Sequence, residues 1–306
     1  MLSHRHVRSS ALLLLALFRS AFAGSANEPP TATYRTAVSE VRIAFFATDE
    51  HNRAIDKISK DDFAVVDNGM VVRDFRSLMR SGETTLDVVA VVDASESVAT
   101  RFQATVKDVL QLVSQKQLAS DDNISVMSFG GLQPVVICVH NCRSAAAGQR
   151  LLAVKAAGAT PLFDALAYGA DFISSRHTPG VRPVLILFSD GDDTISKTSA
   201  RDALEALIAS GALLYAVDLN KPGEISRGSD AMQQMAEMTG GRYFSAGEGA
   251  VRVLEAALED LRASYVVTYQ LPSHAVGFHS LRILPKHNLN LRFHCRNGYY
   301  YESSIP

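Results

Sequence analysis

The pattern of apolar and polar positions changes twice along the chain. Over residues 34–82, short runs of β-branched and aromatic residues are separated by turn signals, of which Asp67-Asn68-Gly69 is the clearest. Over 84–263, apolar runs of strand length alternate with stretches of helical periodicity. From 264 to 306 the strand pattern returns. We therefore expect an α/β region with a β segment on each side of it.

The α/β region contains two nearly continuous apolar runs, Leu86–Val92 and Val184–Phe188. Such runs are typical of central strands that helices cover on both faces. Strands that alternate with helices in this way indicate a Rossmann-like, doubly wound and mostly parallel sheet. Further strands are expected at 124–129, 134–139, 213–217 and 242–244, and helices at 99–116, 144–157, 162–176, 200–210, 231–238 and 251–263.

The two β segments are too short to be stable alone, because an independent sheet needs about three strands with a buried face. We therefore expect residues 264–306 to pair with residues 34–82 in a smaller β domain, into which the α/β domain of 84–263 is inserted. The strands expected in these segments are 41–46, 63–66, 70–75, 265–271, 278–284 and 289–301.

The first 23 residues have the pattern of a secretory signal peptide. A basic stretch precedes the apolar run Ala11–Phe18, and Ala21-Phe22-Ala23 supplies the small residues that a signal peptidase reads. A membrane anchor is disfavoured, because Arg19 ends the apolar run well short of the roughly 20 residues that a spanning helix needs. We expect cleavage after Ala23, a polar linker over 24–33, and a secreted or periplasmic location without membrane insertion.

Charge and cysteine content narrow the function classes only slightly. The formal net charge of −2 gives no reason to expect nucleic acid or an anionic membrane as a partner. Three cysteines are too few for a disulfide scaffold. Cys138 and Cys142 could close a small loop in an oxidising compartment or remain two thiols, with Cys295 left over. A metal cluster that includes His140 is the third alternative, but it lacks a second ligand pair at finger-like spacing.

Short oxygen-bearing side chains follow both of the most apolar strands. Asp93, Ser95 and Ser97 come directly after the first, and Asp190 comes after the second. In an open α/β sheet, ligands bind beyond the carboxyl ends of the strands, where the strand order reverses. Carboxylates and hydroxyls without Cys or His suit a hard cation such as Mg²⁺. The competing interpretation is that Asp93, Ser95 and Ser97 cap a helix. We expect the neighbouring Asp192-Asp193 to be a solvated loop and not to supply further ligands.

The Asp93-x-Ser95-x-Ser97 pattern resembles the metal-ion-dependent adhesion site of von Willebrand factor A domains. That motif is completed by a threonine before a helix and by an aspartate after the fourth strand, and Thr160 and Asp190 stand in this order. The resemblance implies that Ser95 and Ser97 coordinate the metal through their hydroxyls and that Thr160 binds directly or through water. Asp93 and Asp190 would act mostly through bound waters. Thr160 followed by proline could also be a helix N-cap.

The resemblance has consequences for cofactor and partner. It implies Mg²⁺, or Mn²⁺ or Ca²⁺, with one coordination position left open for an Asp or Glu of a partner protein. The flanks are similar to an acidobacterial von Willebrand factor A-related family, through Lys60–Gly69, Tyr265–Tyr269 and Arg296–Tyr300. This second resemblance spans nearly the whole mature chain and implies no function beyond that of the domain.

The combined pattern predicts an exported, divalent-metal-dependent protein-binding or adhesion module that is not an enzyme. The alternative is a structural or assembly subunit that binds its partner without the metal. A metal-dependent phosphohydrolase is less favoured, because Ser95 stands where many such enzymes need a second acidic residue. The sequence also lacks a glycine-rich phosphate loop and a recognisable Ser/His/Asp set.

Overall fold

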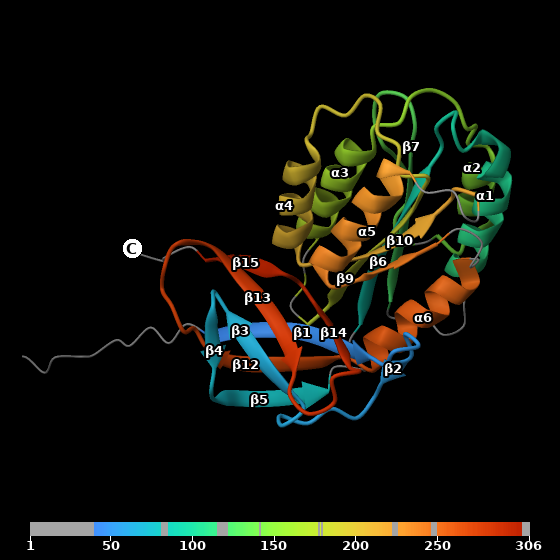
Figure 1. Cartoon of the computed structure of the whole chain (residues 1–306). Helices are drawn as coiled ribbons and strands as arrows, with labels where there is room; N and C mark the ends of the chain where they lie inside the picture. The colour runs from blue at the N-terminus through green and yellow to red at the C-terminus, as the bar shows by residue number, and fades with distance from the viewer. Residues whose placement is uncertain are drawn as a thin grey trace, which may run out of the picture. The chain divides into compact units, whose positions relative to one another are not determined.

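Apolar strands and amphipathic helices alternate to form a central sheet that is covered on both faces (Figure 1). The computed structural model describes residues 40–80, 85–114, 122–140, 142–176, 178, 180–221, 226–245 and 250–301. The expected signal peptide and linker lie outside these residues. Within them, none of the helices is long and apolar enough to cross a membrane.

Six strands of the described residues form the sheet of the α/β region, in the order β11-β10-β9-β6-β7-β8. All neighbouring pairs are parallel except β7 and β8. From β6 the chain passes to β7 on one side, and it later enters β9 on the other side. The strand order therefore reverses between β6 and β9. The strands are β6 (Leu86–Asp93), β7 (Asn123–Phe129), β8 (Val135–Cys138), β9 (Arg182–Ser189), β10 (Leu213–Asp218) and β11 (Arg242–Phe244).

In the described part of the chain, three helices pack on each face of this sheet. Alternate residues of β6 explain why its sequence is apolar throughout: Val88, Ala90 and Val92 join one buried cluster, and Val89 and Val91 join the other. The first cluster includes residues of α1 (Ala99–Val113), α2 (Ala145–Leu152) and α6 (Ala250–Arg262). The second includes residues of α3 (Leu162–Ser174), α4 (Ala200–Ser210) and α5 (Arg227–Thr239).

The expected helix over 144–157 ends early, at Leu152. The apolar residues beyond it, Val154 and Ala156, still pack against the core, but they do so from a non-helical segment. The backbone N–H of Ala157 donates to the carbonyl oxygen of Ala94 at 2.8 Å. The prediction failed here because these apolar positions serve a loop contact and not a further helical turn.

Strands from the two ends of the chain pair with each other. β1 (Glu40–Thr48) pairs with β12 (Tyr265–Gln270), and β3 (Phe63–Asp67) pairs with β13 (Gly277–Pro285), both antiparallel. One sheet has the order β14-β1-β12-β5 with β2 beside β1, and the other has the order β15-β13-β3-β4. Apolar residues of both sheets form a third buried cluster. The remaining strands are β2 (Ala54–Ile55), β4 (Met70–Val72), β5 (Phe75–Arg80), β14 (Arg292–Cys295) and β15 (Gly298–Tyr301).

The single strand expected over 289–301 is wrong. The chain forms β14 and β15 instead, and each belongs to a different sheet. Arg296 and Asn297 connect them, and the N–H of Asn297 donates to the carbonyl oxygen of Met238 at the end of α5 (2.9 Å). This connection attaches the β strands to the α/β region. The expected domain boundaries and the independent folding of 84–263 stay predictions.

A carboxylate lies at the centre of the β strands. Asp67 is fully buried, and its Oδ2 accepts hydrogen bonds from the hydroxyls of Tyr269 and Tyr299, both at 2.7 Å. Nδ1 of His279 lies 3.4 Å from Oδ1 of Asp67. Burial and the hydrogen bond to Asp67 raise the pKa of both tyrosines. Asn68 and Gly69 form the expected turn, since both have positive φ. Asp67 itself is a core residue, which the turn interpretation missed.

The cysteines separate into a bonded pair and one thiol. Cys138 and Cys142 form a disulfide, so the alternative of a metal cluster with His140 is wrong. Cys295 is free, and burial of its thiol raises its pKa to about 12. A thiol with so high a pKa is a poor nucleophile at neutral pH, because the thiolate is the reactive form.

We expect Tyr269→Phe to lower the free energy of unfolding by about 1–3 kcal/mol, because it leaves the buried Asp67 carboxylate with one donor fewer. Urea unfolding followed by circular dichroism measures the loss. Tyr168→Phe is the control, since Tyr168 is 41% exposed on α3. Equal losses in the two variants would contradict a central role for Asp67.

Thiol titration with Ellman's reagent tests the cysteine assignment in protein purified from an oxidising compartment. The folded protein should show no reactive thiol, the unfolded and unreduced protein one, and the fully reduced protein three, since the chain has three cysteines. Three thiols in the unreduced protein would mean that Cys138 and Cys142 are not bonded.

Candidate metal centre

The ends of β6 and β9 lie side by side at the point where the strand order reverses. Val92 of β6 is paired with Phe188 of β9, so the next residues, Asp93 and Ser189, are neighbours. The hydroxyl of Ser189 donates to Oδ2 of Asp93 at 2.6 Å. Asp190 follows directly. The register of two parallel strands thus brings the two predicted carboxylates to one edge of the sheet.

The loop after β6 presents two hydroxyls beside Asp93. Oδ1 of Asp93 accepts from the N–H of Ser95 at 2.9 Å, and the hydroxyl oxygens of Ser95 and Ser97 are 3.0 Å apart. Adjacent ligands of an octahedral Mg²⁺ at about 2.1 Å are themselves about 3.0 Å apart. The N-cap of α1 is Val98. The interpretation of Asp93, Ser95 and Ser97 as helix caps is therefore wrong.

The loop that carries Thr160 is held between the other two loops. On one side, the N–H of Glu96 donates to the carbonyl oxygen of Gly158 at 2.9 Å. On the other side, the N–H of Thr160 donates to the hydroxyl of Thr194 at 2.8 Å, and the N–H of Thr194 donates to the carbonyl oxygen of Thr160 at 2.9 Å. Thr160 is buried, and these backbone bonds hold it next to the Ser95 loop.

The start of α3 is capped by residues from the loop after β9. The N–H of Leu162 donates to Oδ1 of Asp193 at 2.9 Å, and the N–H of Phe163 donates to the hydroxyl of Ser196 at 3.0 Å. The N-cap residue of α3 is Pro161, so Thr160 is not the cap. Asp193, which the sequence placed in a solvated loop, instead ties the Asp190 loop to the Thr160 loop.

Two buried carboxylates lie close together in the site. The pKa of Asp93 is raised to about 6. Burial is the main cause and the charge of Asp190 adds to it, while hydrogen bonds from Ser189 and Ser95 oppose the rise. A side-chain cation also reaches the site, since Nη2 of Arg101 lies 3.9 Å from Oδ2 of Asp190. A bound cation would offset the repulsion between the carboxylates.

The donor set fits a hard divalent cation. It consists of two carboxylates and three hydroxyls, which are the ligand types that Mg²⁺, Mn²⁺ and Ca²⁺ accept. In the described part of the chain, no three His, Cys, Asp or Glu residues gather as a metal cluster. A cation at this edge would therefore rely on Ser95, Ser97 and Thr160 as well as on the carboxylates.

Two glycines set the position of the Asp190 loop. Gly191 has a φ of +83°, and a Cβ on it would lie 2.4 Å from the backbone carbon of Gly228 in the first turn of α5. The reverse contact is equally close, since a Cβ on Gly228 would lie 2.2 Å from the backbone carbon of Gly191. Asn220 completes the support, because its Nδ2 donates to the carbonyl oxygen of Asp190 at 2.8 Å.

Sequence reasoning missed Ser189, Gly228 and Asn220, which position the site without being candidate ligands. Ser189 had a usable signal, because it immediately precedes Asp190 at the end of an apolar strand. Gly228 and Asn220 are separated from Asp190 by more than 25 residues, and only the folded chain brings them to it.

The order of elements and the position of the site agree with one family. Residues 87–256 match the family model of the von Willebrand factor type A domain. The chain belongs to this family. The match confirms the family and the α/β fold that the sequence predicts. It covers the central sheet from β6 and ends within α6.

The von Willebrand factor type A domain of this chain has distant relatives. A magnesium-chelatase 67 kDa subunit from Chlorobaculum parvum is 27% identical over 188 residues, which are 56% of this chain and 30% of that subunit. The chain thus spans less than a third of the length of this curated relative.

Solved structures also show similarity. A von Willebrand factor type A protein from Catenulispora acidiphila is 12% identical, covering 89% of this chain and 76% of its own, with a TM-score of 0.47. The vWF domain of the type V pili tip protein Mfa5 from Porphyromonas gingivalis is 11% identical, with a TM-score of 0.47. The match covers 57% of this chain and 94% of the Mfa5 chain.

The contact between Gly191 and Gly228 predicts that an alanine at position 228 destabilises the protein, although alanine has the higher helix propensity. Alanine favours a helix by about 1 kcal/mol over glycine, yet Gly228→Ala should lower the free energy of unfolding by about 1–3 kcal/mol, because its Cβ meets the backbone of Gly191. Gly148→Ala in α2 is the matched control, since its Cβ would lie 3.6 Å from Leu110, an ordinary contact. Urea unfolding of both variants measures the change in the free energy of unfolding. A Gly228→Ala protein that is more stable than the original would contradict the close approach of Gly228 to Gly191.

Proposed function

We propose that the protein is an exported binding module that engages a partner protein through a divalent cation held by Asp93, Ser95, Ser97, Thr160 and Asp190. The observation that carries the proposal is the spacing of 3.0 Å between the hydroxyls of Ser95 and Ser97, next to the buried Asp93. Membership of the von Willebrand factor type A family supports it.

Each residue would have a separate task at the site. Ser95, Ser97 and Thr160 would supply hydroxyl oxygens, and Asp93 and Asp190 would supply the negative charge. Ser189 and the N–H of Ser95 orient the Asp93 carboxylate from both oxygens. When bound, the cation offers an electrophilic coordination position to a carboxylate.

The rim of the site suits an acidic partner group. Ser97 is exposed at the end of its loop, so a partner can reach its hydroxyl from solvent. Arg101 lies behind it on α1, and its Nη2 donates to the carbonyl oxygen of Ser97 at 3.4 Å. A fixed positive charge beside the cation would favour the approach of an Asp or Glu side chain.

Export is supported by two independent features. The first 23 residues have the pattern of a signal peptide. The disulfide between Cys138 and Cys142 is of the kind that persists in oxidising compartments.

A metal-independent assembly subunit is the second candidate. Arg101 favours it, because a guanidinium 3.9 Å from Asp190 already balances part of the negative charge without a metal. The distant relative is itself a subunit of a magnesium chelatase. The two candidates differ in whether a chelator removes partner binding.

Metal binding should raise the melting temperature of the mature protein. A ligand that binds only the folded state adds about 2.7 kcal/mol at a hundredfold excess over its dissociation constant. We expect Mg²⁺, Mn²⁺ or Ca²⁺ to raise the melting temperature above its value in EDTA, and Ser97→Ala and Asp190→Asn to abolish the rise. Asp74→Asn, an exposed carboxylate in the loop between β4 and β5, is the control.

Partner binding is tested with an array of acidic peptides, each paired with a copy in which Asn or Gln replaces Asp or Glu. The cation-bridged mechanism is supported if the protein binds only the acidic peptides, and if this binding is lost both in EDTA and in the Ser97→Ala variant. Capture that persists in EDTA would favour the metal-independent subunit.

A further inference from the structure

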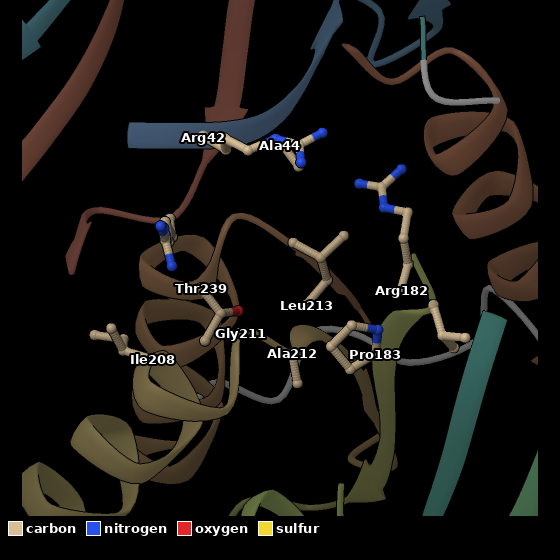
Figure 2. Close-up of a pocket in the computed structure, with 11 residues that line it drawn as sticks. Arg42, Ala44, Arg182, Pro183, Ile208, Gly211, Ala212, Leu213 and Thr239 are labelled. Carbon is tan, nitrogen blue, oxygen red and sulfur yellow. The ribbon is translucent and has the colours of Figure 1, made fainter. Parts of the chain in front are cut away.

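A cavity of about 170 Å³ lies far along the sheet from the candidate metal centre, at the amino ends of β9 and β10 (Figure 2). Three arginines line it: Arg42 from β1, Arg182 at the first position of β9, and Arg296 from the connection between β14 and β15. The rest of the lining is apolar or small, apart from Thr239, and contains no Asp or Glu among the described residues.

Within the described part of the chain, none of the ion pairs includes Arg42, Arg182 or Arg296. Nη1 of Arg182 donates to the carbonyl oxygen of Leu261 at 3.3 Å and to the hydroxyl of Ser264. Both of these acceptors are neutral, so the positive charge is not compensated.

Two other arginines of this protein, both partly buried, have acidic partners. Nη2 of Arg176 donates to both carboxylate oxygens of Asp87 at 3.0 Å. Nη1 of Arg242 likewise donates to both oxygens of Asp260, at 3.2 and 3.1 Å. The cavity thus gathers cations that the fold leaves without the carboxylates it supplies elsewhere.

Uncompensated charge at a partly buried site is costly. Burial lowers the pKa of both Arg182 and Arg296, which is the direction expected when a guanidinium is desolvated without an acidic neighbour. The guanidinium of Arg296 lies over the ring of Tyr299, at 5.5 Å from its centroid. Figure 2 shows the side chains of Arg42 and Arg182 extending into the same space.

We propose that this cavity binds a small oxyanion with more than one negative charge, namely a phosphate group. Guanidinium groups match the oxygens of phosphate with paired hydrogen bonds. Three of them around one space favour a multiply charged tetrahedral anion over a single carboxylate. The volume of about 170 Å³ is below the roughly 300–1,000 Å³ of pockets for drug-sized ligands, so it suits the phosphate group itself.

The site is independent of the candidate metal centre. β9 runs from Arg182 at the cavity to Ser189 beside Asp93, so the two sites lie at opposite ends of the same strand. Phosphate binding should therefore survive Asp190→Asn, and failure of the proposed metal function would leave this proposal standing.

The test is titration calorimetry of the mature, full-length protein with inorganic phosphate at constant ionic strength. We expect saturable binding with one site, weakened at least tenfold by Arg42→Gln and by Arg296→Gln. Arg282→Gln is the matched control, because Arg282 is exposed on β13 and does not line the cavity. Arg42 is also exposed, so its variant should fold even if Arg296→Gln does not.

Two further probes identify the source of the phosphate group. Glycerol 3-phosphate represents a soluble monoester, and vesicles that contain phosphatidic acid represent a lipid headgroup. Binding of either, lost in the same two variants, supports the site and names its source. Absence of saturable binding to inorganic phosphate, or equal weakening in Arg282→Gln, would overturn the proposal.

Discussion

The parallel pairing of β6 with β9 determines most of what the α/β region can do. Because the register aligns Val92 with Phe188, Asp93 and Ser189 meet at the strand ends, and Asp190 enters the same space. The hydrogen bond from Ser189 then holds the Asp93 carboxylate in place. The loops that carry Ser95 and Thr160 are built on this pair, through backbone bonds between Ala94, Glu96, Ala157 and Gly158. A shift of one residue between the two strands would separate Ser189 from Asp93 and break this hydrogen bond.

A second polar centre organises the β strands. Asp67 receives hydroxyl hydrogen bonds from Tyr269 on β12 and from Tyr299 on β15. These three residues belong to the three motifs of the flanks, Lys60–Gly69, Tyr265–Tyr269 and Arg296–Tyr300. The motifs are therefore connected physically, because a buried carboxylate needs hydrogen-bond donors. The pairing of β1 with β12 and of β3 with β13 brings them together.

The sequence predicts those features that depend on local pattern. Burial on both faces makes Leu86–Val92 and Val184–Phe188 continuously apolar, and these runs become β6 and β9. Helix 200–210 was predicted to the residue, because Ser199 caps it and Gly211 ends it in the left-handed conformation.

Features that depend on which loops meet were not predictable. The capping of α3 by Asp193, the contact of Gly191 with Gly228 and the burial of Asp67 all require partners that are distant in sequence. Asp93, Ser95, Ser97 and Asp190 could be named because each follows a recognisable strand, and Thr160 was named through the resemblance to the von Willebrand factor A motif. The residues that position these ligands could not be named, because the sequence around a loop serine or glycine does not indicate which distant residue it will contact.

The way the α/β region is joined to the β strands has a mechanical consequence. β5 ends at Arg80, which is paired with Tyr265 at the start of β12, and these two strands lead into and out of the α/β region. Both connections are therefore anchored in hydrogen-bonded neighbours of one sheet. A pulling force applied at the carboxyl ends of β6 and β9 would divide between two short tethers that start at the same place. Such a load would pull β5 and β12 from the same end and in the same direction, so it would not slide one strand past the other.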